Sequence, residues 1–67
     1  MIWNLEGYRV SGRYMGEHYV SGRVILSRVK YGGAISHTVV LEDPIEVYGS
    51  IRTSVILEPI EILSYVE

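Results

Sequence analysis

The residue types best suited to chemistry gather around a pair of glycines in the first half of the chain. Lys30 and Tyr31 stand directly before Gly32-Gly33, so we expect a cation and an aromatic ring at the tip of a tight turn. Proteins hold single-stranded nucleic acid with rings that stack on bases and cations that bind phosphates. We therefore predict a site for single-stranded RNA or DNA that is lined by Arg28, Lys30, Tyr31, His37 and Arg52.

Two of these residues also have a structural interpretation. Tyr31 is equally compatible with a turn tyrosine that covers one end of the fold, and Arg52 with an exposed strand residue paired with a glutamate. The net charge of −2 argues against duplex binding, which depends on many phosphate contacts. A ring of several copies would change that balance, because it repeats a local basic patch around one axis.

Signals for catalysis and for metal binding are weak. The chain has no cysteine, and its serines do not occur in the Gly-x-Ser-x-Gly pattern of a nucleophile elbow. His18 and His37 are the only histidines and lie far apart, whereas zinc takes three or four protein ligands. The glycine pair lacks the lysine and the helix that follow a phosphate-binding loop. We therefore expect a protein that is not an enzyme and that uses no cofactor or metal.

The elements that must position these residues are strands almost throughout, because β-branched and aromatic residues dominate between seven glycines. The pattern predicts strands over residues 8–14, 18–31, 34–41, 45–57 and 60–66, with bends at Gly22 and Gly49. The turns are expected at 15–17, 32–33, 42–44 and 58–59. This indicates one all-β domain over 1–67, a small five-stranded, strongly bent SH3-like or Sm-like barrel, with an OB-fold as the near neighbour.

A short internal repeat fixes the expected register of the first hairpin. The motif Val-Ser-Gly-Arg begins at Val10 and again ten residues later. A hairpin centred on Gly16 places Ser11 opposite Ser21 and Arg9 opposite Arg23. Like charges that face each other across strands are destabilising unless a counter-charge neutralises them. With the next turn at the glycine pair, Glu42 falls opposite Arg23 and is expected to neutralise the two arginines.

The size and the charge distribution indicate self-association. A chain of 67 residues typically gains only about 3–5 kcal/mol from a single core, and without cysteine no disulfide can add to it. Residues 1–38 carry five basic and two acidic side chains, whereas residues 39–67 carry one basic and six acidic ones. The apolar segment 60–66 would be an aggregation risk as an open edge. We therefore expect a homo-oligomer. The charge distribution is explained either by a head-to-tail ring, in which the basic side of one copy meets the acidic side of the next, or by pairing of adjacent strands within one chain.

The hydropathy pattern contains no membrane segment. No apolar run approaches the roughly 20 residues that a membrane helix requires. The chain also lacks the basic start followed by an apolar stretch that marks a secretory signal. These features are typical of a cytoplasmic protein with no membrane partner.

Two short segments give the chain a resemblance to the Sm-like family. Ile51-Arg52 after a glycine resembles the Ile-Arg-Gly of the second Sm motif, although Thr53 stands where that motif has glycine. Tyr31 resembles the base-stacking aromatic of the first motif, whose Asp/Asn pair is missing here. The family's N-terminal helix is absent or reduced to a lead-in around Trp3.

The resemblance implies a homo-oligomeric ring, assembled through the fourth and fifth strands, that binds single-stranded RNA. Tyr31 would then stack on a base, and Arg52 would contact a base or a phosphate. The cysteine-free, isoleucine-rich composition also resembles small proteins encoded by phages of marine cyanobacteria, one family of which is Sm-like.

A protein partner is the alternative to nucleic acid. The chain is also compatible with an SH3-like interaction module, or with a phage structural or host-takeover protein. In that case an aromatic surface would grip a peptide or a partner protein. The residues expected on that surface are Tyr8, Tyr14, Tyr19 and Tyr48.

Overall fold

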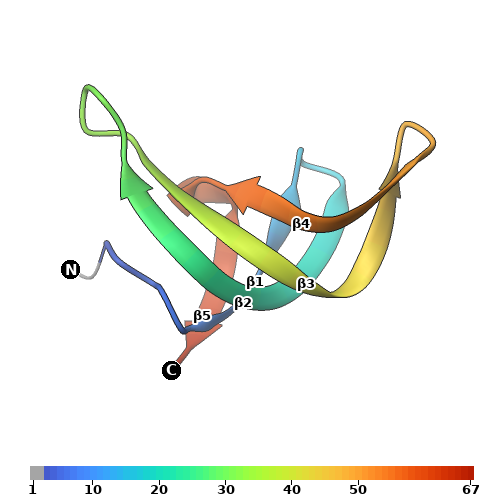
Figure 1. The fold of residues 1–67 in the computed structure, drawn as a ribbon, viewed down its shortest axis with the longest axis horizontal. Coiled ribbons are helices and arrows are strands. Elements are labelled where there is room, and N and C mark those ends of the chain that lie inside the picture. The colour runs from blue at the N-terminus through green and yellow to red at the C-terminus, as the bar shows by residue number, and fades with distance from the viewer. Residues whose placement is uncertain (1–2) are drawn as a thin grey trace.

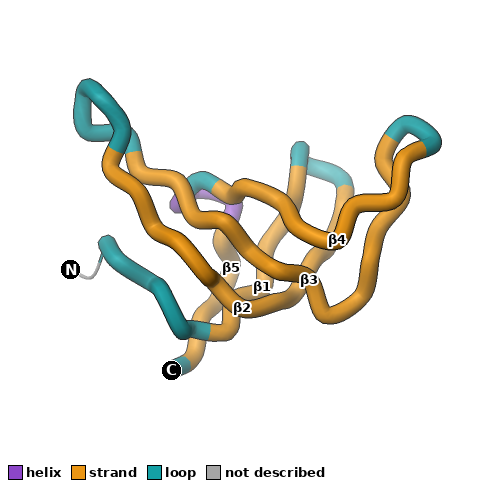
Figure 2. Tube along the Cα trace, viewed as in Figure 1, coloured by secondary structure: helices purple, strands orange, loops and turns teal. Residues whose placement is uncertain are grey.

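The computed structural model describes residues 3–67 and shows one antiparallel sheet of five strongly curved strands (Figures 1 and 2). The elements are β1 (Arg9–Tyr14), β2 (His18–Val29), β3 (Ile35–Val47), β4 (Ser50–Leu57), the 3-10 helix η1 (Pro59–Glu61) and β5 (Ile62–Val66). The strand order is β4-β3-β2-β1-β5. The prediction of a small all-β domain with five bent strands is confirmed.

The sheet is not closed into a barrel, and here the expectation was wrong. Strands β4 and β5 lie at the two ends of the strand order, so each pairs with a neighbour on one side only. The connection between them runs through η1, whose Glu58 and Glu61 form a capping box around Pro59. This short connection turns the chain across the curved sheet and leaves both edges unpaired among the described residues.

The core lies on the concave face of the sheet and consists almost entirely of aliphatic side chains. Alternation along the strands directs every second residue inward, which is the period expected of a half-buried strand. The fully buried side chains at its centre include Val10, Val24, Val39 and Leu57. The remaining members of the cluster are Leu5, Val20, Leu41 and Val55.

The first hairpin has the predicted register. Arg9 pairs with Arg23, and Ser11 pairs with Ser21. Gly22 pairs with Val10 in the same hairpin. Glycine is required there for a steric reason, because a Cβ atom would collide with the backbone carbonyl of Val40 on β3. The strands therefore approach each other closely at Gly22, and only a residue without a side chain fits.

The predicted boundary between the third and fourth strands was wrong. We expected a turn at 42–44, but β3 continues through Pro44 to Val47. The proline is accommodated because the β3–β4 register shifts between Val40 and Ile45, and such an irregularity needs no donor from the proline nitrogen. The turn lies instead at Tyr48-Gly49, where both φ angles are positive, 50° and 79°, as a two-residue hairpin loop requires.

Candidate nucleic-acid interface

The β2–β3 hairpin ends in a tight loop at the predicted glycine pair. The amide of Lys30 donates to the carbonyl of Ala34 at 2.6 Å, and the amide of Gly33 donates back to the carbonyl of Lys30 at 2.9 Å. Gly32 and Gly33 adopt φ angles of 91° and 90°, which other residues rarely do. These bonds close the loop so tightly that Tyr31 is fully exposed at its tip, which places its ring where a base can stack on it.

Two cations accompany this ring on the same arm of the hairpin. Arg28 and Lys30 are exposed and lie two residues apart, the spacing that places side chains on one face of an extended segment. Within residues 3–67, neither has a carboxylate oxygen within ion-pair distance, and the same holds for Arg52. The structural interpretation of Arg52 as the partner of a glutamate is therefore wrong, and all three cations have charge available for phosphates.

Arg52 does not lie beside Tyr31 in one chain. It is on β4 opposite Ile45, close to the β3–β4 turn. That turn and the β2–β3 loop extend from opposite ends of the curved sheet (Figure 1). A site that contains both residues therefore requires more than one copy of the chain.

His37 is placed away from the predicted surface. Its side chain is only 2% exposed and lies inside the fold, so we remove it from the set of residues that contact nucleic acid. Its Nδ1 lies 2.7 Å from the Ser27 hydroxyl oxygen, which also accepts the amide of Leu5 at 3.0 Å. His37 is buried because it lies on the inward face of β3, where it pairs with Leu57 on β4.

Burial makes His37 a pH-dependent element of the fold. It lowers the pKa of His37 below its ordinary value of 6.5. As the pH falls through 6.5, the unfolded chain therefore takes up a proton at this residue that the folded protein resists. We expect the free energy of unfolding, measured with urea at pH 7 and pH 5.5, to be lower at pH 5.5. In the variant His37→Leu, the free energy of unfolding should fall less between pH 7 and pH 5.5, whereas His18→Gln should show the same fall as the unmodified protein. An unchanged pH dependence in His37→Leu would contradict the role of His37.

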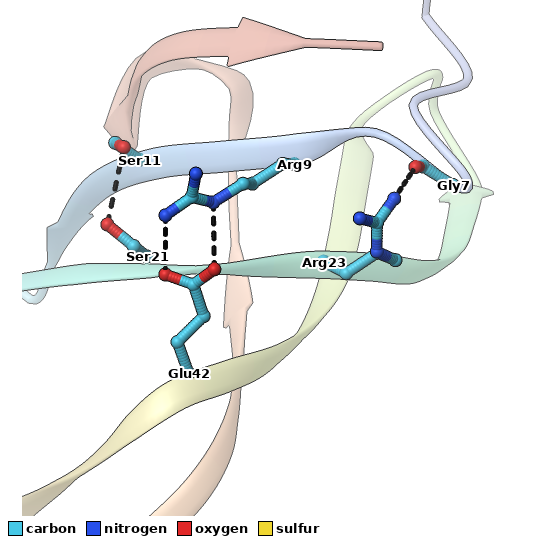
Figure 3. A network of polar contacts seen from close by, with 6 residues as sticks. All are labelled: Gly7, Arg9, Ser11, Ser21, Arg23 and Glu42. Atoms are coloured by element: carbon cyan, nitrogen blue, oxygen red, sulfur yellow. Dashed lines mark hydrogen bonds and ion pairs between the residues drawn. The ribbon is translucent and has the colours of Figure 1, made fainter.

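A polar network on the opposite side of the sheet explains how the arginine pair is tolerated (Figure 3). Arg9 makes two contacts of 2.8 Å with the carboxylate of Glu42, and Arg23 donates to the carbonyl of Gly7. Glu42 was correctly predicted to neutralise an arginine of this pair. It does not face Arg23, however. Val29 pairs with Ile35, so the loop is one residue longer than expected, and a further shift between Val24 and Leu26 places Arg23 opposite Val40.

A pocket with a volume of about 530 Å³ was not predicted from the sequence. It lies between the N-terminal segment, one end of β3, the 3-10 helix and β5. The residues that line it are Trp3, Leu5, Ile35, His37, Pro59, Ile62, Leu63, Ser64 and Tyr65. They come from four separate segments, so only the strand order, which sets β5 beside β1, brings them together.

The four tyrosines expected on a single partner-binding surface are divided between environments. Tyr8 and Tyr14 pack partly buried against the core, and the ring of Tyr8 lies 5.7 Å from that of Tyr65. Tyr19 is exposed beneath the guanidinium of Arg13, whose central carbon lies 5.0 Å from the ring centre. Tyr48 is exposed at the β3–β4 turn. These positions do not form the single aromatic surface of the alternative interpretation.

Other kinds of site are not evident in the described part of the chain. Within residues 3–67, no three histidine, aspartate or glutamate side chains are grouped closely enough to hold a metal ion. No helix in this range is both long and apolar enough to cross a membrane. Comparisons of the chain with protein-family models, with curated proteins and with solved structures find no match.

Proposed function

We propose that this protein is a non-catalytic, Sm-like protein of the cytoplasm that forms a homo-oligomeric ring and binds single-stranded RNA or DNA. The observation that carries the proposal is the fully exposed ring of Tyr31 at the tip of a closed loop, next to the unpaired cations Arg28 and Lys30. An aromatic side chain that packs on nothing in its own chain is well suited to stack on an unpaired base.

The two open edges of the sheet support assembly into a ring. Strand β5 exposes Leu63, Tyr65 and Val66, and strand β4 exposes Ile51 and Ile56. Pairing of β4 in one copy with β5 in the next satisfies both edges by the same contact, and repeating a head-to-tail contact generates a ring when the rotation closes. The contact also buries apolar area that a domain of this size needs for stability.

Ring formation also resolves the two difficulties of the nucleic-acid site. A single chain carries a net charge of −2, which disfavours broad binding to phosphates. In a ring, the hairpin tips with Lys30 and Tyr31 are repeated around one axis, so that several cations and rings meet one strand of nucleic acid. Arg52, at the other end of the sheet, then joins the site from a neighbouring copy.

Native mass spectrometry of the purified protein, with and without a short oligo-U strand, tests the proposal. We expect one closed oligomer of defined subunit number and a second species heavier by the mass of one or a few strands. A control with duplex DNA of equal length should add no mass at the same ionic strength. A protein that stays monomeric at all concentrations, or an oligomer that never takes up oligo-U, would contradict the proposal.

The open edges also favour a protein-interaction module as the second candidate. An unpaired edge such as β4 can accept an extended peptide as an added strand, with the exposed side chains Ile51 and Ile56 beside it. This function predicts that a partner protein is captured from a lysate even after nuclease treatment. Under the nucleic-acid proposal, nuclease treatment removes the captured material.

A further inference from the structure

The pocket of about 530 Å³ between the N-terminal segment and β5 has the dimensions of a small-molecule site. Its walls are formed largely by aliphatic and aromatic side chains, such as Leu5, Ile35 and Ile62, with Trp3 and Tyr65 at its sides. Among residues 3–67, no lysine, arginine, aspartate or glutamate lines it. A charged ligand would therefore lose its hydration without gaining a counter-charge, and the pocket favours a neutral and mostly apolar molecule.

One polar group inside this pocket has a defined hydrogen-bonding role, and that group is the imidazole of His37. The Ser27 hydroxyl oxygen accepts the amide of Leu5 at 3.0 Å, so its own hydrogen is free to be donated to Nδ1 of His37 at 2.7 Å. The hydroxyl keeps a second acceptor site, so either atom of this pair can be the donor. When the Ser27 hydroxyl donates, Nδ1 is the acceptor and the ring proton of the neutral imidazole is on Nε2.

Nε2 of His37 has no hydrogen-bond partner among residues 3–67. The hydrogen bond between the His37 ring and Ser27 involves Nδ1 alone. Within residues 3–67, no fully buried side-chain nitrogen or oxygen lacks a hydrogen-bond partner, so Nε2 retains access to open space. Because the side chain as a whole is 98% buried and lines this pocket, that space is the pocket itself.

We propose that this pocket binds a neutral, mostly apolar small molecule with one hydrogen-bond acceptor, a carbonyl or ether oxygen, which accepts the proton of His37 Nε2. The Ser27 hydroxyl acts as a positioning group that holds the imidazole in this tautomer. Burial lowers the pKa of His37 and so keeps the ring neutral, which suits an uncharged ligand. The proposal does not depend on nucleic-acid binding, since the pocket and the Tyr31 loop involve different residues. Leu63 and Tyr65 do belong both to the pocket and to the β5 surface of the proposed ring contact.

An NMR titration of the ¹⁵N-labelled protein with two probes of similar shape tests this assignment. Coumarin is neutral and offers a carbonyl oxygen, whereas naphthalene has a similar two-ring frame and no acceptor. We expect coumarin to shift the amide signals of Leu5, Ile35 and Leu63, and to shift the Nε2 signal of His37. Naphthalene should shift the same amides and leave the Nε2 signal much less affected.

The variant His37→Leu separates the hydrogen bond from apolar binding. Its Kd for coumarin should rise by about fivefold or more, as loss of one hydrogen bond in an apolar site implies, while its Kd for naphthalene changes by less than about twofold. The dispersion of its amide spectrum reports whether the variant is folded. If it is not, the Nε2 response of the unmodified protein to the two probes decides the question by itself.

Three results would overturn the proposal. If coumarin leaves the pocket amides unshifted, the pocket takes no such ligand. If the Nε2 signal and the Kd values are the same for both probes and both proteins, His37 does not recognise the acceptor. If the pocket signals shift with protein concentration alone and neither probe binds, a second copy of the chain occupies the pocket.

Discussion

Replacement of Tyr31 with alanine is expected to weaken the binding of single-stranded oligo-U by about tenfold or more, because stacking of one base on an aromatic ring contributes about 1–3 kcal/mol. The folded structure should change little, since the ring packs on nothing in its own chain. Fluorescence anisotropy of a labelled strand gives the Kd of both proteins. Tyr31→Phe should bind nearly as well as the unmodified protein, because it retains the ring.

The β3–β4 turn provides a matched control for this experiment. Tyr48 is also an exposed turn tyrosine, but it lies at the other end of the sheet, away from Arg28 and Lys30. Tyr48→Ala should lower the affinity for oligo-U much less than Tyr31→Ala, although its turn lies near Arg52. Equal losses in the two variants would show that exposed tyrosines act without a defined site, and no loss in Tyr31→Ala would sink the assignment of the stacking residue.

Replacement of Gly22 with alanine is expected to destabilise the fold more than any surface substitution. The added Cβ would collide with the backbone carbonyl of Val40, and backbone on β3 cannot move aside as a flexible side chain can. Overpacking of this kind typically costs about 1–3 kcal/mol. For a domain of this size, that corresponds to a Tm lower by roughly 10 °C or more. Thermal unfolding followed by circular dichroism measures the change.

The neighbouring residue supplies the control for this second prediction. Ser21→Ala removes a partly buried hydroxyl that lies 3.3 Å from the hydroxyl of Ser11, but it adds no atom to a crowded position. Its loss of stability should stay well below that of Gly22→Ala. Both proteins are compared at one concentration, because self-association makes Tm depend on concentration. A Tm for Gly22→Ala equal to that of Ser21→Ala would contradict the close approach of β2 and β3.

The local pattern of the chain is sufficient to predict that five strands form and where the first two turns lie. Alternation of apolar residues and the glycine pair at 32–33 act over a few residues, so they can be recognised without knowledge of the fold. The β3–β4 turn shows where such signals fail. Asp43-Pro44 is a strong turn signal, yet Tyr48-Gly49 forms the turn, because a register shift accommodates the proline within β3.

The candidate site was predictable to a similar extent. Tyr31, Lys30 and Arg28 lie on one hairpin, so their proximity follows from local sequence alone. His37 is buried because it continues the alternation of Val39 and Leu41 along β3. The inward position of its partner Ser27 depends on the irregularity of β2 between Val24 and Leu26, because a shift of one residue reverses which face a side chain occupies. The pocket beside β5 depends on contacts between the ends of the chain, which no local pattern reveals.

The most direct test of the central claim is fluorescence anisotropy of labelled oligo-U, oligo-dT and duplex DNA at two salt concentrations. We predict micromolar or tighter binding of the single strands, weaker binding of the duplex, and affinities that fall as salt rises because cations contact phosphates. Absence of binding to either single strand at low salt would contradict the nucleic-acid function and would favour a protein partner at the open edges of the sheet.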